Sequence, residues 1–117
     1  MNNSCEFTKK YTKDERLQKV KFMKDKFPHK IPIVVIFSKD LTYSDKQFLV
    51  DSQQSLGEFI SILRKSHITN IKSSDAIFCL INNTLHPLYE TLGSLYLDNA
   101  LDDQILYIHI KKESTFG

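Results

Sequence analysis

The 117-residue sequence contains no tryptophan and only three glycines, three prolines, two cysteines and two methionines. Such low glycine and proline contents are not those of a disordered or low-complexity chain. The two cysteines form no C-x-x-C pair, which argues against the common zinc and redox motifs. No apolar run approaches the roughly 18 residues of a membrane-spanning helix, and no apolar stretch near the N-terminus suggests a signal peptide. We therefore expect one cytoplasmic domain over residues 1–117.

The sequence also lacks the residue groupings that catalysis requires. Gly57, Gly93 and Gly117 lie too far apart to form a phosphate-binding loop. The four histidines stand singly, without an H-x-x-x-H pair, so no metal site is expected. The adjacent acids Asp102 and Asp103 fall in a predicted turn, where acids commonly bind the backbone. We predict that the chain is not an enzyme and needs no cofactor.

Charge is distributed unevenly along the chain. Residues 1–30 contain nine Lys or Arg and four Asp or Glu, whereas the remainder contains seven and ten. A basic segment of this kind is typical of contact with anionic lipid, tubulin-like acidic surfaces or acidic peptides, and equally of a solvated helix face. Nucleic acid is not an expected partner, because the segment lacks interleaved aromatics and the isoelectric point of about 8.5 is below the roughly 9 of such domains.

Hydrophobic periodicity and turn residues divide the sequence into short elements. In the first helix, Leu17, Val20, Met23 and Phe27 recur at steps of three and four, and Pro28 ends the helix. Thr12 with Glu15 has the spacing of a capping box at its start, and Ser55 with Glu58 has the same spacing at the start of the second helix. The expected elements are, in chain order, a helix over 12–27, strands over 31–37 and 47–51, a helix over 55–65, a strand over 77–81, a helix from Pro87 to Tyr96, and a strand over 105–110.

A hairpin of two strands followed by a helix and two more strands is the β-β-α-β-β order of ubiquitin. The early hairpin disfavours a ferredoxin-like sandwich, which begins β-α-β. The predicted fold class is therefore α+β, a ubiquitin-like β-grasp with an extra N-terminal helical segment. Residues 1–30 would form the helical part, 31–112 the β-grasp core and 113–117 a flexible C-terminal tail. Asn82-Asn83 is predicted to form a type I′ turn.

Five short motifs, in the correct order, carry a resemblance to a known family. They are Lys26–Pro32, Lys46–Val50, Gly57–Phe59 ahead of Ile62–Lys65, Ala76–Phe78 with Asn82–Leu85, and Leu106-Tyr107 with a terminal Phe116-Gly117. Together they resemble the autophagy ubiquitin-like modifiers, the family of GABA-receptor-associated protein and microtubule light-chain 3. The resemblance covers nearly all of residues 5–117.

This resemblance implies conjugation through Gly117. A separate enzyme would activate its carboxylate with ATP, and a conjugating enzyme would join it to phosphatidylethanolamine on the autophagosome membrane. Glycine has no Cβ, so the acyl carbon would be unhindered, and Phe116 would serve as a recognition handle. The implied partners are these enzymes, a processing protease and the lipid, with microtubules as a further candidate. The implied location is the cytoplasm, and the autophagosome membrane after lipidation.

The resemblance also implies a peptide-binding groove along residues 47–50. Receptor peptides of the form W/F/Y-x-x-L/I/V would add to this strand as an extra strand. An aromatic pocket would use Lys19, Met23, Pro32, Leu49 and Ile105. An aliphatic pocket would use Phe48, Val50, Phe59 and Ile62. Acids flanking the peptide would meet Lys30 and Lys46. Several of these apolar residues are equally expected as plain core.

Four positions depart from the usual family pattern. The family often has an acid at Lys19, a basic residue at Gln47, a proline at Asp51 and a phenylalanine at Ile105. These departures affect the charge and depth expected of the aromatic pocket more than they affect the conjugation site. An unconjugated peptide- or tubulin-binding adaptor of the same fold therefore stands as the alternative function.

Overall fold

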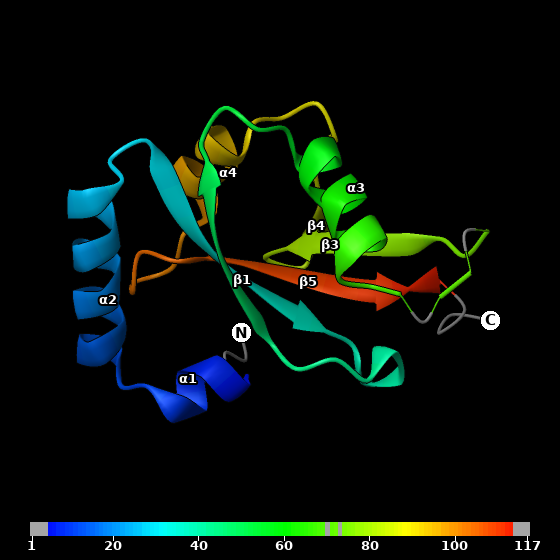
Figure 1. Ribbon diagram of the computed structural model, residues 1–117, viewed down its shortest axis with the longest axis horizontal. Helices are drawn as coiled ribbons and strands as arrows, with labels where there is room; N and C mark the ends of the chain where they lie inside the picture. The colour runs from blue at the N-terminus through cyan, green and yellow to red at the C-terminus, as the bar shows by residue number, and fades with distance from the viewer. Residues whose placement is uncertain (1–4, 70, 73, 114–117) are drawn as a thin grey trace.

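The computed structural model describes residues 5–69, 71–72 and 74–113, without the side chain of Asp40 (Figure 1). Phe116 and Gly117 lie outside the described residues. The elements are α1 (Glu6–Lys10), α2 (Lys13–Lys26), β1 (Lys30–Phe37), η1 (Lys39–Leu41), β2 (Lys46–Asp51), α3 (Leu56–Ser66), β3 (Ile77–Ile81), β4 (Thr84–Leu85), α4 (Leu92–Asn99) and β5 (Leu106–Lys112).

The strands form one mixed sheet in the order β2-β1-β5-β3-β4. The central pair β1 and β5 is parallel, and the other neighbours are antiparallel. The last strand thus returns to the middle of the sheet, beside the first. This confirms the predicted ubiquitin-like fold, in which an N-terminal helical segment precedes the sheet.

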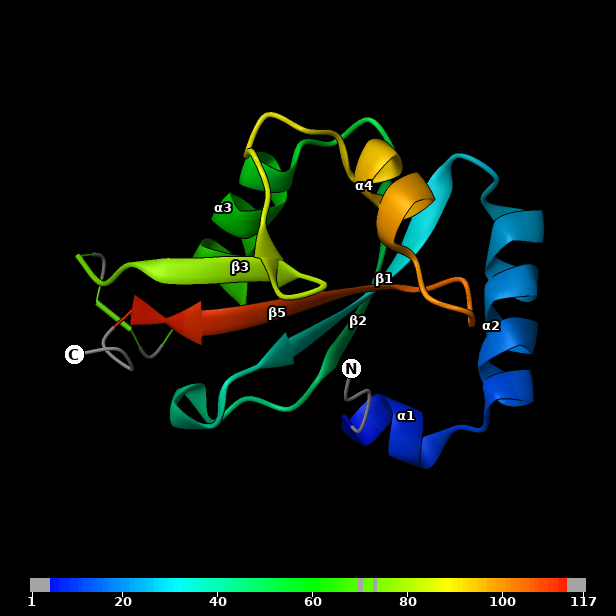
Figure 2. The same cartoon turned by 180° about the vertical axis from the view of Figure 1, so that it is seen from behind.

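Each face of the sheet has its own hydrophobic cluster. On β1, Ile33 and Val35 point into the main core with residues of α3 and α4, whereas Val34 points the other way. The second cluster joins Val34 to Val20 of α2 and Phe7 of α1. This alternation follows from the two-residue period of a strand. The two pairs of helices accordingly lie on different sides of the sheet (Figures 1 and 2).

Capping residues set the starts of the two longer helices. The Thr12 hydroxyl accepts from the Glu15 amide at 3.2 Å, and the Glu15 carboxylate accepts from the Thr12 amide at 2.8 Å. Ser55 and Glu58 form the same reciprocal pair at the start of α3, at 3.1 and 2.9 Å. Both capping boxes were predicted from the three-residue spacing alone. The positive φ values of Asn82 (52°) and Asn83 (62°) are those that a type I′ turn requires.

The prediction of a helix starting at Pro87 is wrong. Helix α4 begins at Leu92, after the N-cap Thr91, whose hydroxyl accepts from the Ser94 amide at 3.2 Å. The carbonyl of Leu88 instead accepts from the Gly57 amide and that of Glu90 from the Leu56 amide, both at 2.9 Å. These tertiary bonds hold the segment as a turn against the start of α3. The short α1 and the two-residue β4 were also not predicted as elements.

His109 gives the fold a predicted pH dependence. Burial lowers the pKa of this half-buried imidazole, Lys111 adds to the lowering, and Asp45 opposes it. Since the unfolded chain then binds the proton more readily, this group's contribution to the free energy of unfolding is complete above pH ~6.5 and falls below it. We expect His109→Gln to show a smaller loss of stability than the wild type between about pH 7.5 and about pH 5.5 in urea titrations. Equal pH dependences in the wild type and His109→Gln would contradict the assignment.

Candidate peptide-binding face

Strand β2 lies at one edge of the sheet, with β1 as its neighbour. The outer side of an edge strand presents backbone N–H and C=O groups to which another strand can add. In the register with β1, Leu49 lies opposite Pro32 and Phe48 lies opposite Ile33. Leu49 therefore shares the face of the second cluster, and Phe48 shares the face of the main core. The predicted pockets begin on opposite faces of this strand.

The residues predicted for the aromatic pocket come from four parts of the chain. Lys19 and Met23 lie on α2, Pro32 on β1, Leu49 on β2, and Ile105 directly before β5. Ile105 is 2% exposed and Pro32 is buried, so these two can form only the floor of a pocket. The other three are half-buried, and Met23 packs against the cluster that contains Ile105. The fold thus places Met23 and Ile105 at the same hydrophobic cluster.

Tyr11 is a neighbour of this region that sequence reasoning missed. Its ring contacts Phe7, with centroids 5.2 Å apart, and the Lys19 ammonium lies 4.4 Å from its centroid. Cation–π attraction therefore holds Lys19 over an aromatic ring at the position where the family often has an acid. An aromatic residue just ahead of helix α2 is the only signal in the sequence that could have indicated this role.

The residues predicted for the aliphatic pocket differ in exposure. Phe59 is 2% exposed and packs edge-on against Phe48, with centroids 5.3 Å apart. His67 contacts the same Phe48 ring at 5.1 Å. Ile62 on the next turn of α3 is 45% exposed, and Val50 is half-buried. A ligand on this face would therefore meet Phe48, Val50 and Ile62, while Phe59 supports them from below.

The two lysines predicted to attract acids lie at opposite ends of the edge strand. Lys46 begins β2, and Lys30 pairs in register with Asp51 at its end. Asp51, where the family often has proline, accepts a 2.8 Å hydrogen bond from the Gln53 amide and so helps to turn the chain after the strand. The edge strand therefore carries a cation near each end.

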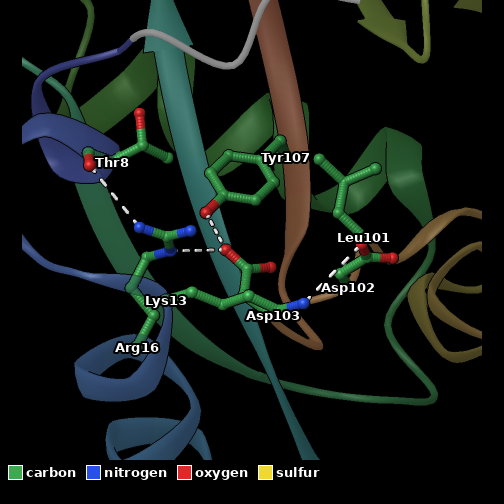
Figure 3. A pocket seen from close by; sticks show the side chains of 7 residues that line it. All are labelled: Thr8, Lys13, Arg16, Leu101, Asp102, Asp103 and Tyr107. Carbon is green, nitrogen blue, oxygen red and sulfur yellow. Dashed lines mark hydrogen bonds and ion pairs between the residues drawn. The ribbon is translucent and has the colours of Figure 1, made fainter.

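A buried polar network joins α2 to the segment before β5 (Figure 3). The Asp103 carboxylate, 4% exposed, accepts from Arg16 Nε at 2.8 Å and from the Tyr107 hydroxyl, both at Oδ2. Its Oδ1 accepts from the Ile105 amide at 3.1 Å. Burial and the hydrogen bond to Asp103 raise the pKa of Tyr107, which keeps the phenol protonated as a donor. The group lines a pocket of about 290 Å³ with Lys13 and Asp102.

Asp103 was predicted to bind backbone in a turn, and the bond from Ile105 fits that expectation. Its pairing with Arg16, 87 residues away, could not be predicted. No grouping of His, Cys, Asp and Glu suited to a metal ion is present among the described residues, and burial raises the pKa of the Cys79 thiol to about 12.

A comparison with protein families decides the identity of this fold. A family model described as autophagy protein Atg8, ubiquitin-like, matches residues 15–117. The chain belongs to the Atg8 family. Its structure is similar to the crystal structure of Trypanosoma brucei ATG8, with a TM-score of 0.84, 24% sequence identity, and coverage of 98% of this chain and 100% of that one. At this identity, the likeness supports the fold alone.

Atg8-family membership agrees with the resemblance that the five motifs carry. The family is one of ubiquitin-like modifiers and not of enzymes, and its members are cytoplasmic and associate with autophagosomes. Among the helices formed by the described residues, none is long and apolar enough to cross a membrane.

Proposed function

We propose that the chain is conjugated through the carboxylate of Gly117 to phosphatidylethanolamine on autophagosomal membranes. The observation that carries this proposal is the Atg8 family match, which extends to residue 117. The proposal holds equally for a chain made with Gly117 at its end and for one trimmed to it by a processing protease. Phe116 is the proposed recognition handle for the enzymes of the pathway.

The chemistry is activation with ATP followed by acyl transfer. The Gly117 carboxylate displaces pyrophosphate from ATP to form an acyl adenylate, an enzyme cysteine displaces AMP to form a thioester, and the lipid amine finally displaces the thiol to form an amide. Two acyl chains, at about 0.8 kcal/mol per buried CH₂, provide stable anchoring where a single chain is marginal. The mass of the membrane-bound protein tests this proposal, as set out in the Discussion.

The second part of the proposed function is the binding of W/F/Y-x-x-L/I/V receptor peptides at the edge strand β2. The position of β2 at the edge of the sheet supports this, because a peptide can pair with it as a sixth strand. Leu49 on one face and Phe48 with Val50 on the other would receive alternate side chains of the peptide. Lys30 and Lys46 would attract acids at its two ends.

Replacing Leu49 tests the groove. Leu49→Ala removes apolar surface at the rim of the aromatic pocket and should weaken binding of such a peptide by about tenfold, which corresponds to ~1.4 kcal/mol. Isothermal titration calorimetry measures the change. Leu85→Ala is the matched control, because Leu85 is 60% exposed and lies on β4, at the opposite edge of the sheet from β2. Titrations of Leu49→Ala that reproduce the wild-type affinity would refute the site.

A further inference from the structure

The bond between Arg16 and Asp103 joins the two segments that would form opposite walls of the aromatic pocket. One wall is helix α2, and the other is the segment from Asp103 to Tyr107. On α2, Arg16 lies four residues before Val20 and seven before Met23, so the three share a helix face. On the other wall, Ile105 and Tyr107 follow Asp103 at two-residue steps. Val20, Ile105 and Tyr107 belong to one buried cluster, against which Met23 packs. The ion pair therefore ties the α2 wall to the Ile105 wall.

The same network also reaches the end of α1. Arg16 Nη1 donates to the Tyr11 carbonyl at 2.6 Å, and the Tyr11 ring lies beneath the Lys19 ammonium. Arg16 is part of the helix that carries Lys19 and Met23. Its guanidinium binds both the backbone of Tyr11, beneath Lys19, and the carboxylate beside Ile105. Of the five residues predicted for the aromatic pocket, Lys19 and Met23 lie on the helix that carries Arg16, and the Ile105 amide donates to the carboxylate that Arg16 binds.

The burial of the pair makes its loss consequential. The side chains of Arg16 and Asp103 are 15% and 4% exposed, and removing one partner leaves the other charge largely desolvated and unpaired. The adjacent pair Lys13–Asp102 differs in this respect. Its atoms are 3.7 Å apart and its side chains are 54% and 93% exposed, so solvent screens the attraction. The chain thus supplies its own matched control, one residue away in the same pocket.

We propose that Arg16 and Asp103 are positioning residues of the aromatic pocket, which fix the distance between α2 and Ile105 and thereby its width. This rests on the proposed peptide binding at β2. Asp103→Asn keeps the size of the side chain but removes the charge that holds Arg16, so α2 loses its fixed position against the Ile105 wall. The aliphatic half of the groove lies on the other face, against α3, and keeps its geometry.

The test compares two peptides that differ only at the aromatic position, F-x-x-L and A-x-x-L, by fluorescence anisotropy. The ratio of their Kd values reports the aromatic pocket alone. We expect the wild type to prefer F-x-x-L by about tenfold or more. Asp103→Asn should reduce this ratio by at least about threefold while leaving the Kd of A-x-x-L unchanged. Asp102→Asn should keep the wild-type ratio.

Each outcome decides the inference. If Asp103→Asn is folded by circular dichroism and keeps the wild-type ratio, or weakens both peptides equally, the positioning role is overturned. Where Asp103→Asn fails to fold, Arg16→Lys decides in its place, because it keeps the cation but removes the donors that bind Asp103 and the Tyr11 carbonyl at once. An unchanged ratio in Arg16→Lys then overturns the inference. A wild type that binds both peptides equally overturns the proposed aromatic pocket and this inference together.

Discussion

Removing Gly117 is expected to reduce membrane association of the protein to the background level. The chain would then end in the carboxylate of Phe116, whose Cβ and ring crowd the carbon that must form the thioester. Membrane flotation under conditions that induce autophagy measures the effect. Gly117→Ala, which adds one methyl group beside the acyl carbon, should fall between the wild type and the deletion.

The control for this prediction is Ser114→Ala, a change in the same tail that leaves the acyl donor intact. It should float with membranes as the wild type does. The deletion and the wild type should also have the same urea midpoint, so that lost folding is not the cause. A form without Gly117 that floats to the wild-type extent would rule out attachment through this residue.

Replacing Phe59 with alanine is expected to have the largest effect on stability. The side chain is 2% exposed, contacts Phe48 edge-on and belongs to the main core. Removing a buried phenylalanine leaves a cavity, and we expect a loss of about 3–5 kcal/mol in the free energy of unfolding. Guanidinium titrations monitored by circular dichroism measure it.

A variant of Ile62, one turn further along α3, distinguishes the role of a core residue from that of a residue at the predicted pocket. At 45% exposure, Ile62→Ala should lower the free energy of unfolding by less than about 1 kcal/mol, yet weaken peptide binding. Equal losses of stability in Phe59→Ala and Ile62→Ala would show that Phe59 is not the support of this face.

The elements that could be predicted are those whose signals are local. The capping boxes at Thr12 and Ser55 lie within three residues of their partners, and the apolar segment over 31–37 has few alternatives to a buried strand. The start of α4 could not be predicted in this way. The backbone of the segment after Pro87 is bonded to the start of α3, about 30 residues earlier, and only the assembled fold contains that contact.

The candidate site likewise contains residues that local signals could predict and residues that they could not. The family motifs could indicate the residues along β2, because these residues are consecutive in the sequence. Periodicity placed Met23 on the inner face of α2, where it packs against the second cluster. The bond between Arg16 and Asp103, which we propose supports the aromatic pocket, could not be predicted, because the two residues lie 87 positions apart. The role of Tyr11 could not be predicted for a similar reason, because its partners Phe7 and Lys19 belong to two different helices.

Two of the departures from the family pattern have local physical roles. Asp51 accepts a bond from the Gln53 amide, which turns the chain where proline would fix it by its ring. Lys19 lies over the Tyr11 ring, so its charge has an aromatic partner within this chain. The structure does not explain Gln47, which is exposed on the edge strand.

The most direct test of the conjugation proposal is the mass of the protein isolated from autophagosomal membranes. Intact-mass measurement, followed by fragmentation of the C-terminal peptide, should show phosphatidylethanolamine joined by an amide bond to Gly117. Membrane-bound protein that carries no adduct, or carries one at any residue other than Gly117, would contradict the proposal.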